Sequence, residues 1–204
     1  MLKRAIAVAL CLGLSSVATQ AGEAGDAVFA ERAPWTLDDD GLHWSLHVAG
    51  PEAEGFLPID DGSVTLTEVV DPSDGKPVLQ ITQKTDTRSR EIGPFPISGG
   101  DPVLIFFLEQ TARDVAKMTG GSPFYIRNRI KDAVFRGGQI AGEGETRTAS
   151  FRPFDGDPNA ARMQGFQTLT LTFVMGSDPA SPIREMTART EGDAPGYENR
   201  MVLQ

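Results

Sequence analysis

The chain has 204 residues, and its 28 acidic against 19 basic residues give a formal net charge of -9. This excess of acid argues against nucleic acid as a partner, because binding to a phosphate backbone needs a net basic surface. It also argues against general attachment to anionic lipid, so only a local basic patch could serve that purpose.

Residues 1–21 have the pattern of a secretory signal peptide. Lys3 and Arg4 precede an apolar stretch, residues 5–14, that is too short to span a bilayer. Small residues follow and allow cleavage anywhere between positions 18 and 24. We therefore expect export to the bacterial periplasm, with no stable transmembrane anchor in the mature chain.

The remaining residues, 22–204, are expected to form a single periplasmic α+β domain. Cys11 is the only cysteine and would leave with the signal peptide, so no disulfide can stabilise the mature chain. Loss of Lys3 and Arg4 would shift the net charge from -9 to -11. A chain of about 180 residues is long enough to bury an adequate hydrophobic core.

The first half of the mature chain has the alternation of antiparallel strands. Strands are predicted at residues 41–48, 63–70 and 78–87, with a further short strand near 90–95. The turn sequence DPSDGKP joins the second and third of these strands into a hairpin.

Two consecutive helices are predicted in the middle of the chain. Asp101-Pro102 begins the first, which continues to Met118 and ends at Gly120-Gly121. Ser122-Pro123 begins the second in the same way, and Gly137-Gly138 ends it. The first helix is apolar almost all round in its first two turns, so other elements must cover it on several sides.

Strands are predicted again at residues 146–154, 166–175, 183–190 and 197–203. Strands followed by helices and then more strands, without β-α-β alternation, indicate an α+β fold. We expect an antiparallel curved sheet or open barrel of about seven or eight strands, with the two consecutive central helices packed on its concave face.

The sequence contains no pattern that demands a catalytic centre or a metal. His43 and His47 would share one face of a strand about 13 Å apart, which is too far to ligate one metal together. GGSPF lacks the second glycine of a hydrolase nucleophile elbow, so Ser122 is better explained as a helix cap. No glycine-rich nucleotide loop is present, and no cofactor is expected.

Two acidic features could still carry chemistry. Asp155, Asp157 and Asn159 have the spacing that begins a calcium-binding loop, but the turn glycine and the final bidentate acid are missing. These loop acids are therefore expected to be solvated. Glu109 lies on an apolar helix, and we expect Arg113 to neutralise it at i,i+4 spacing.

The segment GGSPFYIRNRIKDAVFRGG, residues 120–138, concentrates basic charge in an acidic chain. Arg129, Asp132 and Arg136 are expected to form an ion-pair ladder along one flank of the helix. Arg127 and Lys131 occupy the other flank and are expected to lack partners. Phe124 and Phe135 lie off the main apolar stripe, so they could face a ligand or a partner.

The preferred functional hypothesis is a non-enzymatic exported protein that binds an apolar or amphipathic, lipid-like small molecule. Its candidate ligand-binding residues are Phe106, Phe107, Phe124, Arg127, Lys131 and Phe135. One alternative is an assembly or interaction subunit that contacts another envelope protein. The second alternative is a hydrolase or isomerase that uses Glu109, His43 or His47.

Overall fold

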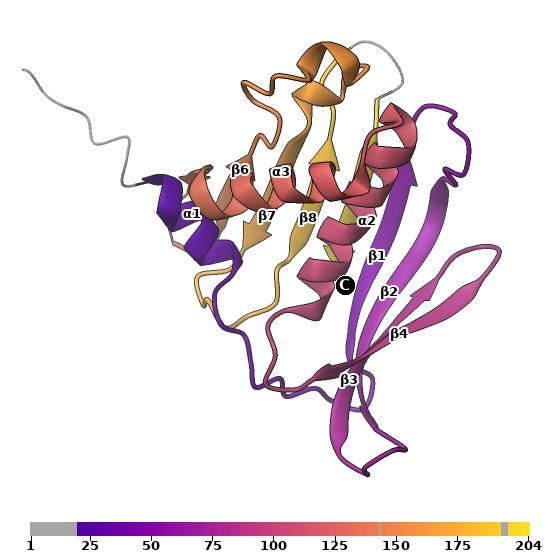
Figure 1. The fold of residues 1–204 in the computed structure, drawn as a ribbon. Coiled ribbons are helices and arrows are strands. Elements are labelled where there is room, and N and C mark those ends of the chain that lie inside the picture. Colours follow the sequence, from indigo (N-terminus) through magenta and orange to yellow (C-terminus); the bar gives the residue numbers. More distant parts are fainter. Residues whose placement is uncertain (1–19, 143, 193–195) are drawn as a thin grey trace, which may run out of the picture.

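Nine strands form the framework of the computed structural model, which describes residues 20–142, 144–192 and 196–204 (Figure 1). In chain order they are β1 (Leu42–Ala49), β2 (Ile59–Val70), β3 (Pro77–Lys84), β4 (Ser89–Pro96), β5 (Gln139–Ala141), β6 (Arg147–Phe151), β7 (Thr170–Met175), β8 (Glu185–Arg189) and β9 (Glu198–Leu203). The predicted α+β class is confirmed. The ninth strand, β5, was not predicted because three residues are too few to show an alternation.

The strands make one open antiparallel sheet in the order β4-β3-β2-β1-β9-β8-β7-β6-β5. Strands β1 to β4 form one meander and strands β5 to β9 form another. The two meanders join where β1 pairs with β9, from Trp44 opposite Leu203 to Ala49 opposite Glu198. As predicted, β1 buries Trp44, Leu46 and Val48 and turns its histidines outward.

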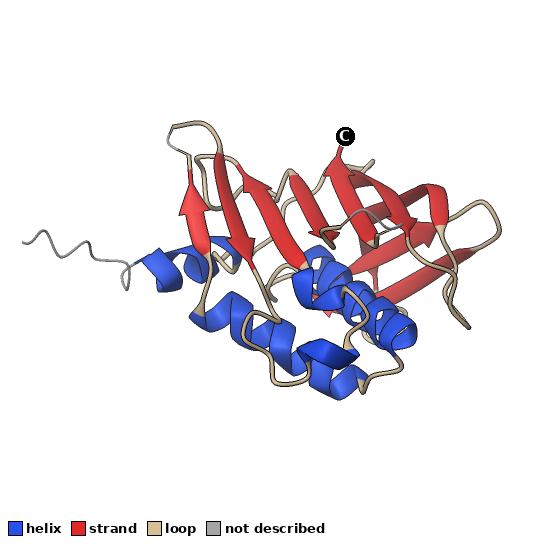
Figure 2. Ribbon diagram, turned by 90° about the horizontal axis from the view of Figure 1, so that it is seen from above, coloured by secondary structure: helices blue, strands red, loops and turns tan. Residues whose placement is uncertain are grey.

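Two short 3₁₀ helices, Ala160–Arg162 and Phe166–Thr168, precede β7, so the strand predicted from residue 166 begins only at Thr170. Three α-helices accompany the sheet in the described part of the chain: α1 (Gln20–Val28), α2 (Pro102–Thr119) and α3 (Pro123–Arg136). Figure 2 shows them on one side of the sheet. Strands β4 and β5 lie at opposite edges, so the chain between them must cross the sheet. Helices α2 and α3 make that crossing and pack against each other.

The predicted ends of α2 and the predicted start of α3 are confirmed. The Asp101 side chain accepts hydrogen bonds from the backbone N–H groups of Val103 and Leu104, both at 3.0 Å. Gly120 ends α2 with a φ of 64°, a left-handed conformation that glycine adopts without strain. Ser122 accepts a hydrogen bond from the Tyr125 N–H at the start of α3.

Helix α1 was not predicted. Its sequence, QAGEAGDAV, contains two glycines and has little intrinsic tendency to form a helix. It is stabilised instead by tertiary contacts with α3, β5 and β6. Its first two residues are also the last two of the predicted signal peptide, whose other residues, 1–19, lie outside the described part of the chain.

The side chain of Arg32 links the end of α1 to the start of α2. Its Nη1 donates to the Val28 carbonyl at 2.9 Å, and its Nε donates to the Ser181 carbonyl at 3.1 Å. The same Nε lies 3.8 Å from Oδ2 of Asp101, the residue that caps α2. Burial lowers the pKa of Arg32 and raises the pKa of Asp101, while the attraction between the two charges opposes both shifts.

The core fills the space between α2 and the sheet. Phe107 of α2 is fully buried and meets Phe173 of β7 edge-on, with ring centroids 6.0 Å apart. Phe173 also contacts Phe151 of β6. Within residues 20–142, 144–192 and 196–204, no helix has both the length and the apolar character needed to cross a bilayer.

Candidate functional site

An apolar hollow lies between the three helices, and we call it the helix groove. Its volume is about 280 Å³. Its apolar lining is Phe29, Ile105, Leu108, Ile130, Val134 and Phe135, and its rim is Glu109, Arg127 and Lys131. Three residues of the sequence-based site, Arg127, Lys131 and Phe135, therefore come together here.

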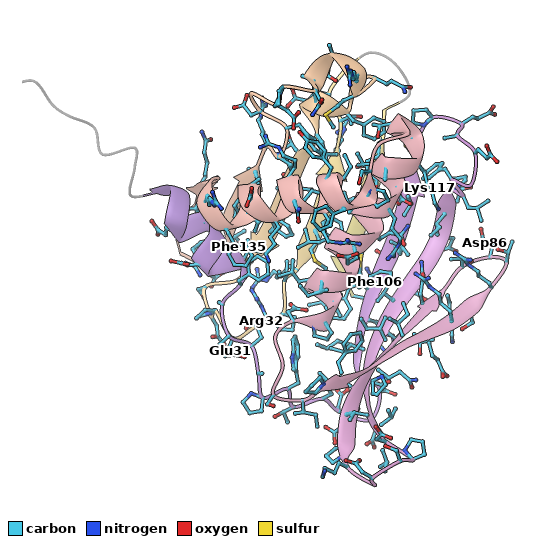
Figure 3. The ribbon with its side chains drawn as sticks, viewed as in Figure 1. Glu31, Arg32, Asp86, Phe106, Lys117 and Phe135 are labelled. Atoms are coloured by element: carbon cyan, nitrogen blue, oxygen red, sulfur yellow. The ribbon has the colours of Figure 1, made fainter. Side chains whose placement is uncertain are left out.

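The wall of the groove nearest α1 is an aromatic pair. The rings of Phe29 and Phe135 are stacked, with centroids 4.8 Å apart and planes 11° from parallel. Helix α1 reaches this position because Gly25 packs directly on α3, where an added Cβ would lie 2.3 Å from the Val134 carbonyl oxygen. Figure 3 shows Phe135 at the end of α3 that meets α1.

Two large apolar side chains of the groove remain accessible to solvent. Phe135 is 53% exposed and Ile105 is 47% exposed. Exposed apolar area that lines a hollow gains free energy when a ligand covers it, at roughly 25 cal/mol per Å². The groove can therefore bind an apolar group without rearrangement of the core.

The rim of the groove holds one ion pair and one further cation. Arg127 donates from Nη2 to Oε2 of Glu109 at 2.8 Å and from Nε to Oε1, so the pair is bidentate. The hydrogen bonds to Glu109, with its charge, raise the pKa of Arg127. Lys131 lies 5.9 Å from the centroid of the Phe135 ring and forms no ion pair with any described residue.

The Glu109–Arg127 pair corrects two sequence-based expectations. Arg113 was expected to neutralise Glu109, but its Nη2 donates to Oε1 of Gln110 instead, at 3.3 Å. Arg127 was expected to lack a partner, but it faces Glu109 across the contact between α2 and α3. A sequence periodicity within one helix cannot reveal a partner on another helix.

The expected ladder along α3 is only partly formed. Arg136 contacts Asp132 at 3.5 Å on the exposed surface. The prediction was wrong for Arg129, whose Nε lies 2.8 Å from Oδ2 of Asp157. Arg129 therefore ties the loop after β6 to α3.

Asp157 is buried, so the expectation of solvated loop acids was wrong for this residue. The Tyr125 hydroxyl donates to its carboxylate at 2.7 Å, and the Asn159 N–H donates at 2.7 Å. Burial alone would raise the pKa of Asp157, but these hydrogen bonds and the charge of Arg129 outweigh burial and lower it. The Asp157 carboxylate therefore holds the loop after β6 against α3.

The other predicted site residues are dispersed. Phe107 lies in the core, and Phe106 lines an adjoining cleft between α2 and β4. Phe124 is 68% exposed and lies three turns from Phe135 on the same face of α3. It lines neither of these two hollows.

The groups of the enzymatic alternative are not brought together. His43 is on the outer face of β1, where Nε2 contacts the Asp40 carbonyl at 2.8 Å. His47 is on the same outer face, near the Asp60 carbonyl. Glu109 lies on α2, which covers the opposite face of the sheet. Among the described residues, no group of three or more histidine, cysteine or acidic side chains could hold a metal ion.

A buried polar network that the sequence analysis missed connects α2 to β9. Tyr197, just before β9, donates its hydroxyl to Oδ2 of Asp114 at 3.2 Å, and Gln110 donates to the same carboxylate at 2.9 Å. Burial raises the pKa of Asp114, against the effect of the Gln110 hydrogen bond and the Lys117 charge. Burial and the Asp114 charge also raise the pKa of Tyr197 well above its usual value. Asp114 was overlooked because charged helix residues are usually on the surface.

Comparison with known proteins gives no independent assignment of this site. No protein-family model matches the chain, and no curated protein is significantly similar to it in sequence.

Proposed function

We propose that this protein binds the apolar part of an anionic amphiphile in the helix groove, as a non-enzymatic protein of the bacterial cell envelope. The observation that carries the proposal is the accessible hollow of about 280 Å³ whose walls are apolar and whose rim is charged. The secretory pattern of residues 1–21 motivates the envelope location. Recovery of the full-length protein only from the cytoplasm, after osmotic shock of expressing cells, would contradict that location.

The size of the groove restricts its ligand. Small-molecule sites are typically about 300–1,000 Å³, so this groove is near the lower limit. It suits one alkyl chain or one ring system. A large lipid would have to leave most of its surface outside.

The charge at the rim restricts the head group. Arg127 neutralises the charge of Glu109. The Lys131 ammonium, which lies beside the Phe135 ring, has no carboxylate partner among the described residues. An anionic head group beside Lys131 would gain Coulomb energy that a neutral head group would not. We therefore expect fatty acids to bind more tightly than fatty alcohols of equal length.

Calorimetric titration with decanoate and decanol tests the proposal. Phe135→Ala should weaken decanoate binding about tenfold, equivalent to about 1.4 kcal/mol, because it removes one wall of the groove. Phe124→Ala is the matched control on the same helix face and should change the affinity less than twofold. Equal effects of the two substitutions, or no binding of either ligand by the wild-type protein, would reject the groove as the site.

One observation favours a second candidate function, contact with an envelope protein through α3. Phe124 is more exposed than Phe135 and lines neither the helix groove nor the cleft between α2 and β4. Exposed aromatic side chains are common anchors of protein interfaces. A photo-crosslinking amino acid at position 124 should then capture one defined envelope protein in cells, whereas the same probe at exposed position 57 should not. Capture of the same proteins from both positions would argue against this function.

A further inference from the structure

A second hollow, between α2 and β4, concentrates arginine side chains over an apolar floor. We call it the arginine cleft, and its volume is about 250 Å³. Its floor includes Ile92, Phe95 and Phe106, and Arg90 and Arg113 rise from its two sides. Figure 3 shows Phe106 on α2, facing the β-strand side of the helix.

Arg90 is held in place by neutral groups. Its Nε donates to Oε1 of Gln83 on the neighbouring strand at 2.7 Å. Its guanidinium carbon lies 6.0 Å from the centroid of the Phe106 ring, within the range of a cation–π contact. These contacts orient Arg90 and leave both of its terminal nitrogens without a protein acceptor among the described residues.

Arg113 is likewise bonded to a neutral amide, the Gln110 side chain, which itself donates to the buried carboxylate of Asp114. Among the residues that the structure describes, no carboxylate lies within ion-pair distance of Arg88, Arg90 or Arg113. Glu109 also lines the cleft, but Arg127 already binds both of its oxygens. The cleft therefore has surplus positive charge in a protein whose net charge is -9.

The arginines also act on one another. Burial lowers the pKa of Arg90, and the charges of Arg113 and Arg88 lower it further. An anion placed between these like charges would reduce their mutual repulsion. A guanidinium binds a carboxylate or a phosphate with paired hydrogen bonds, which gives this anion a preferred geometry.

We propose that the arginine cleft binds an oxyanion carried on a single aromatic ring, with the anion between Arg90 and Arg113 and the ring on Ile92, Phe95 and Phe106. Carboxylates and phosphate monoesters share this chemistry. The two hollows adjoin, since Ile105 and Glu109 line both. The inference still goes beyond the helix groove, because Phe135 and Lys131 line only that groove and Arg90 and Arg113 line only the arginine cleft.

Four probes that share one ring test the site: benzoate, phenyl phosphate, benzyl alcohol and benzylamine. We expect the two anions to bind and to shift the backbone NMR signals of β4 and of the first half of α2. Benzyl alcohol should bind at least tenfold more weakly than the better anion, and benzylamine should not bind. Whichever anion binds more tightly identifies the head group, carboxylate or phosphate.

Arg90→Gln and Arg113→Gln should each weaken binding of the better anion at least fivefold. Arg136→Gln removes the same charge from the exposed surface of α3 and should change the affinity less than twofold. Phe135→Ala should leave anion binding unchanged, which separates this site from the helix groove. The inference is overturned if benzyl alcohol binds as tightly as the anions, or if all three arginine substitutions have the same effect.

Arg90 also bonds to Gln83, so its substitution could disturb the sheet edge. The thermal midpoint of each variant should therefore be measured beside its affinity. Arg113→Gln serves as a second variant that should not disturb the sheet, because Arg113 is on the helix and has no hydrogen bond to the sheet among the described contacts. Full anion affinity in a folded Arg113→Gln variant would also overturn the proposal.

Discussion

Glu109 of α2 and Arg127 of α3 form a bidentate ion pair at the rim of the helix groove, with Oε2 of Glu109 2.8 Å from Nη2 of Arg127. The pair removes one positive charge from the binding surface. It also links α3 to α2 through paired hydrogen bonds between a planar carboxylate and a planar guanidinium.

Replacing the acid of this pair should change ligand preference more than stability. Glu109→Gln leaves Arg127 uncompensated, so we expect decanoate to bind about threefold more tightly and decanol to bind unchanged. The free energy of unfolding should fall by less than about 1 kcal/mol, because the pair is partly exposed. Calorimetry with both ligands checks the result, and an equal gain for decanol would show that charge is not the cause.

Substitution of alanine for the two glycines of α1 should have different effects on stability and on ligand affinity. Gly25→Ala would place a methyl group against the Val134 carbonyl, so it should push α1 away from α3, weaken decanoate binding and lower stability. Gly22→Ala is the matched control, because nothing lies within 4 Å of the added group. It should be neutral or stabilise the protein by up to about 1 kcal/mol. A Gly25→Ala variant with full affinity would show that α1 does not shape the groove.

Arg32 should be among the most sensitive positions for stability. Arg32→Ala would leave the Val28 and Ser181 carbonyls without their donor and the buried Asp101 without its nearest cation, so we expect a loss of about 3 kcal/mol or more. Arg136→Ala breaks an exposed pair and should cost less than about 1 kcal/mol. Urea denaturation of both variants checks this contrast, and losses of similar size would contradict it.

Asp157 should make stability depend on pH. Its pKa is lower in the folded protein than the usual unfolded value of about 3.9. The ionised carboxylate therefore stabilises the folded protein fully at pH values above the unfolded-state pKa. This stabilisation is lost as the pH falls through the folded-state pKa. Asp157→Asn should cost about 2 kcal/mol near pH 7, the range for a hydrogen bond to a charged group.

The free energies of unfolding of wild type and Asp157→Asn should therefore become more similar as the pH falls below about 4. Denaturant titrations across this range measure it. Asp155→Asn is the control, because Asp155 is exposed and has no side-chain hydrogen bond among the described contacts. A difference that stayed constant with pH would mean that the Asp157 charge does not stabilise the loop.

Local sequence patterns predicted the elements well. Alternation in FQTLTLTFVM predicted β7, whose Leu171, Phe173 and Met175 are buried, although residues 166–168 form a 3₁₀ helix and not strand. The Asp101-Pro102 and Ser122-Pro123 pairs marked where the two central helices begin. Such signals depend on neighbours along the chain. Helix α1 was not predicted because it is stabilised by contacts with elements that are distant in the sequence and not by its neighbours along the chain.

The candidate site was predicted less completely. Phe135, Arg127 and Lys131 stood out because they lie off the apolar stripe of one helix. Phe29, Ile105 and Arg90 did not, because their importance depends on which elements meet. Phe107 looked like a ligand contact for its hydrophobicity, which is the same property that places it in the core.

The sequence by itself determined the α+β class, the ends of the two central helices and the inward faces of strands such as β1, because hydrophobic periodicity and capping act over a few residues. Only the tertiary structure decided that β1 pairs with β9, that Glu109 meets Arg127, and that Arg90 and Arg113 share a cleft. The physical reason is that strand pairing and ion pairing depend on distances in space. Many partners are compatible with one charge pattern, and the packing of helices on the sheet selects among them.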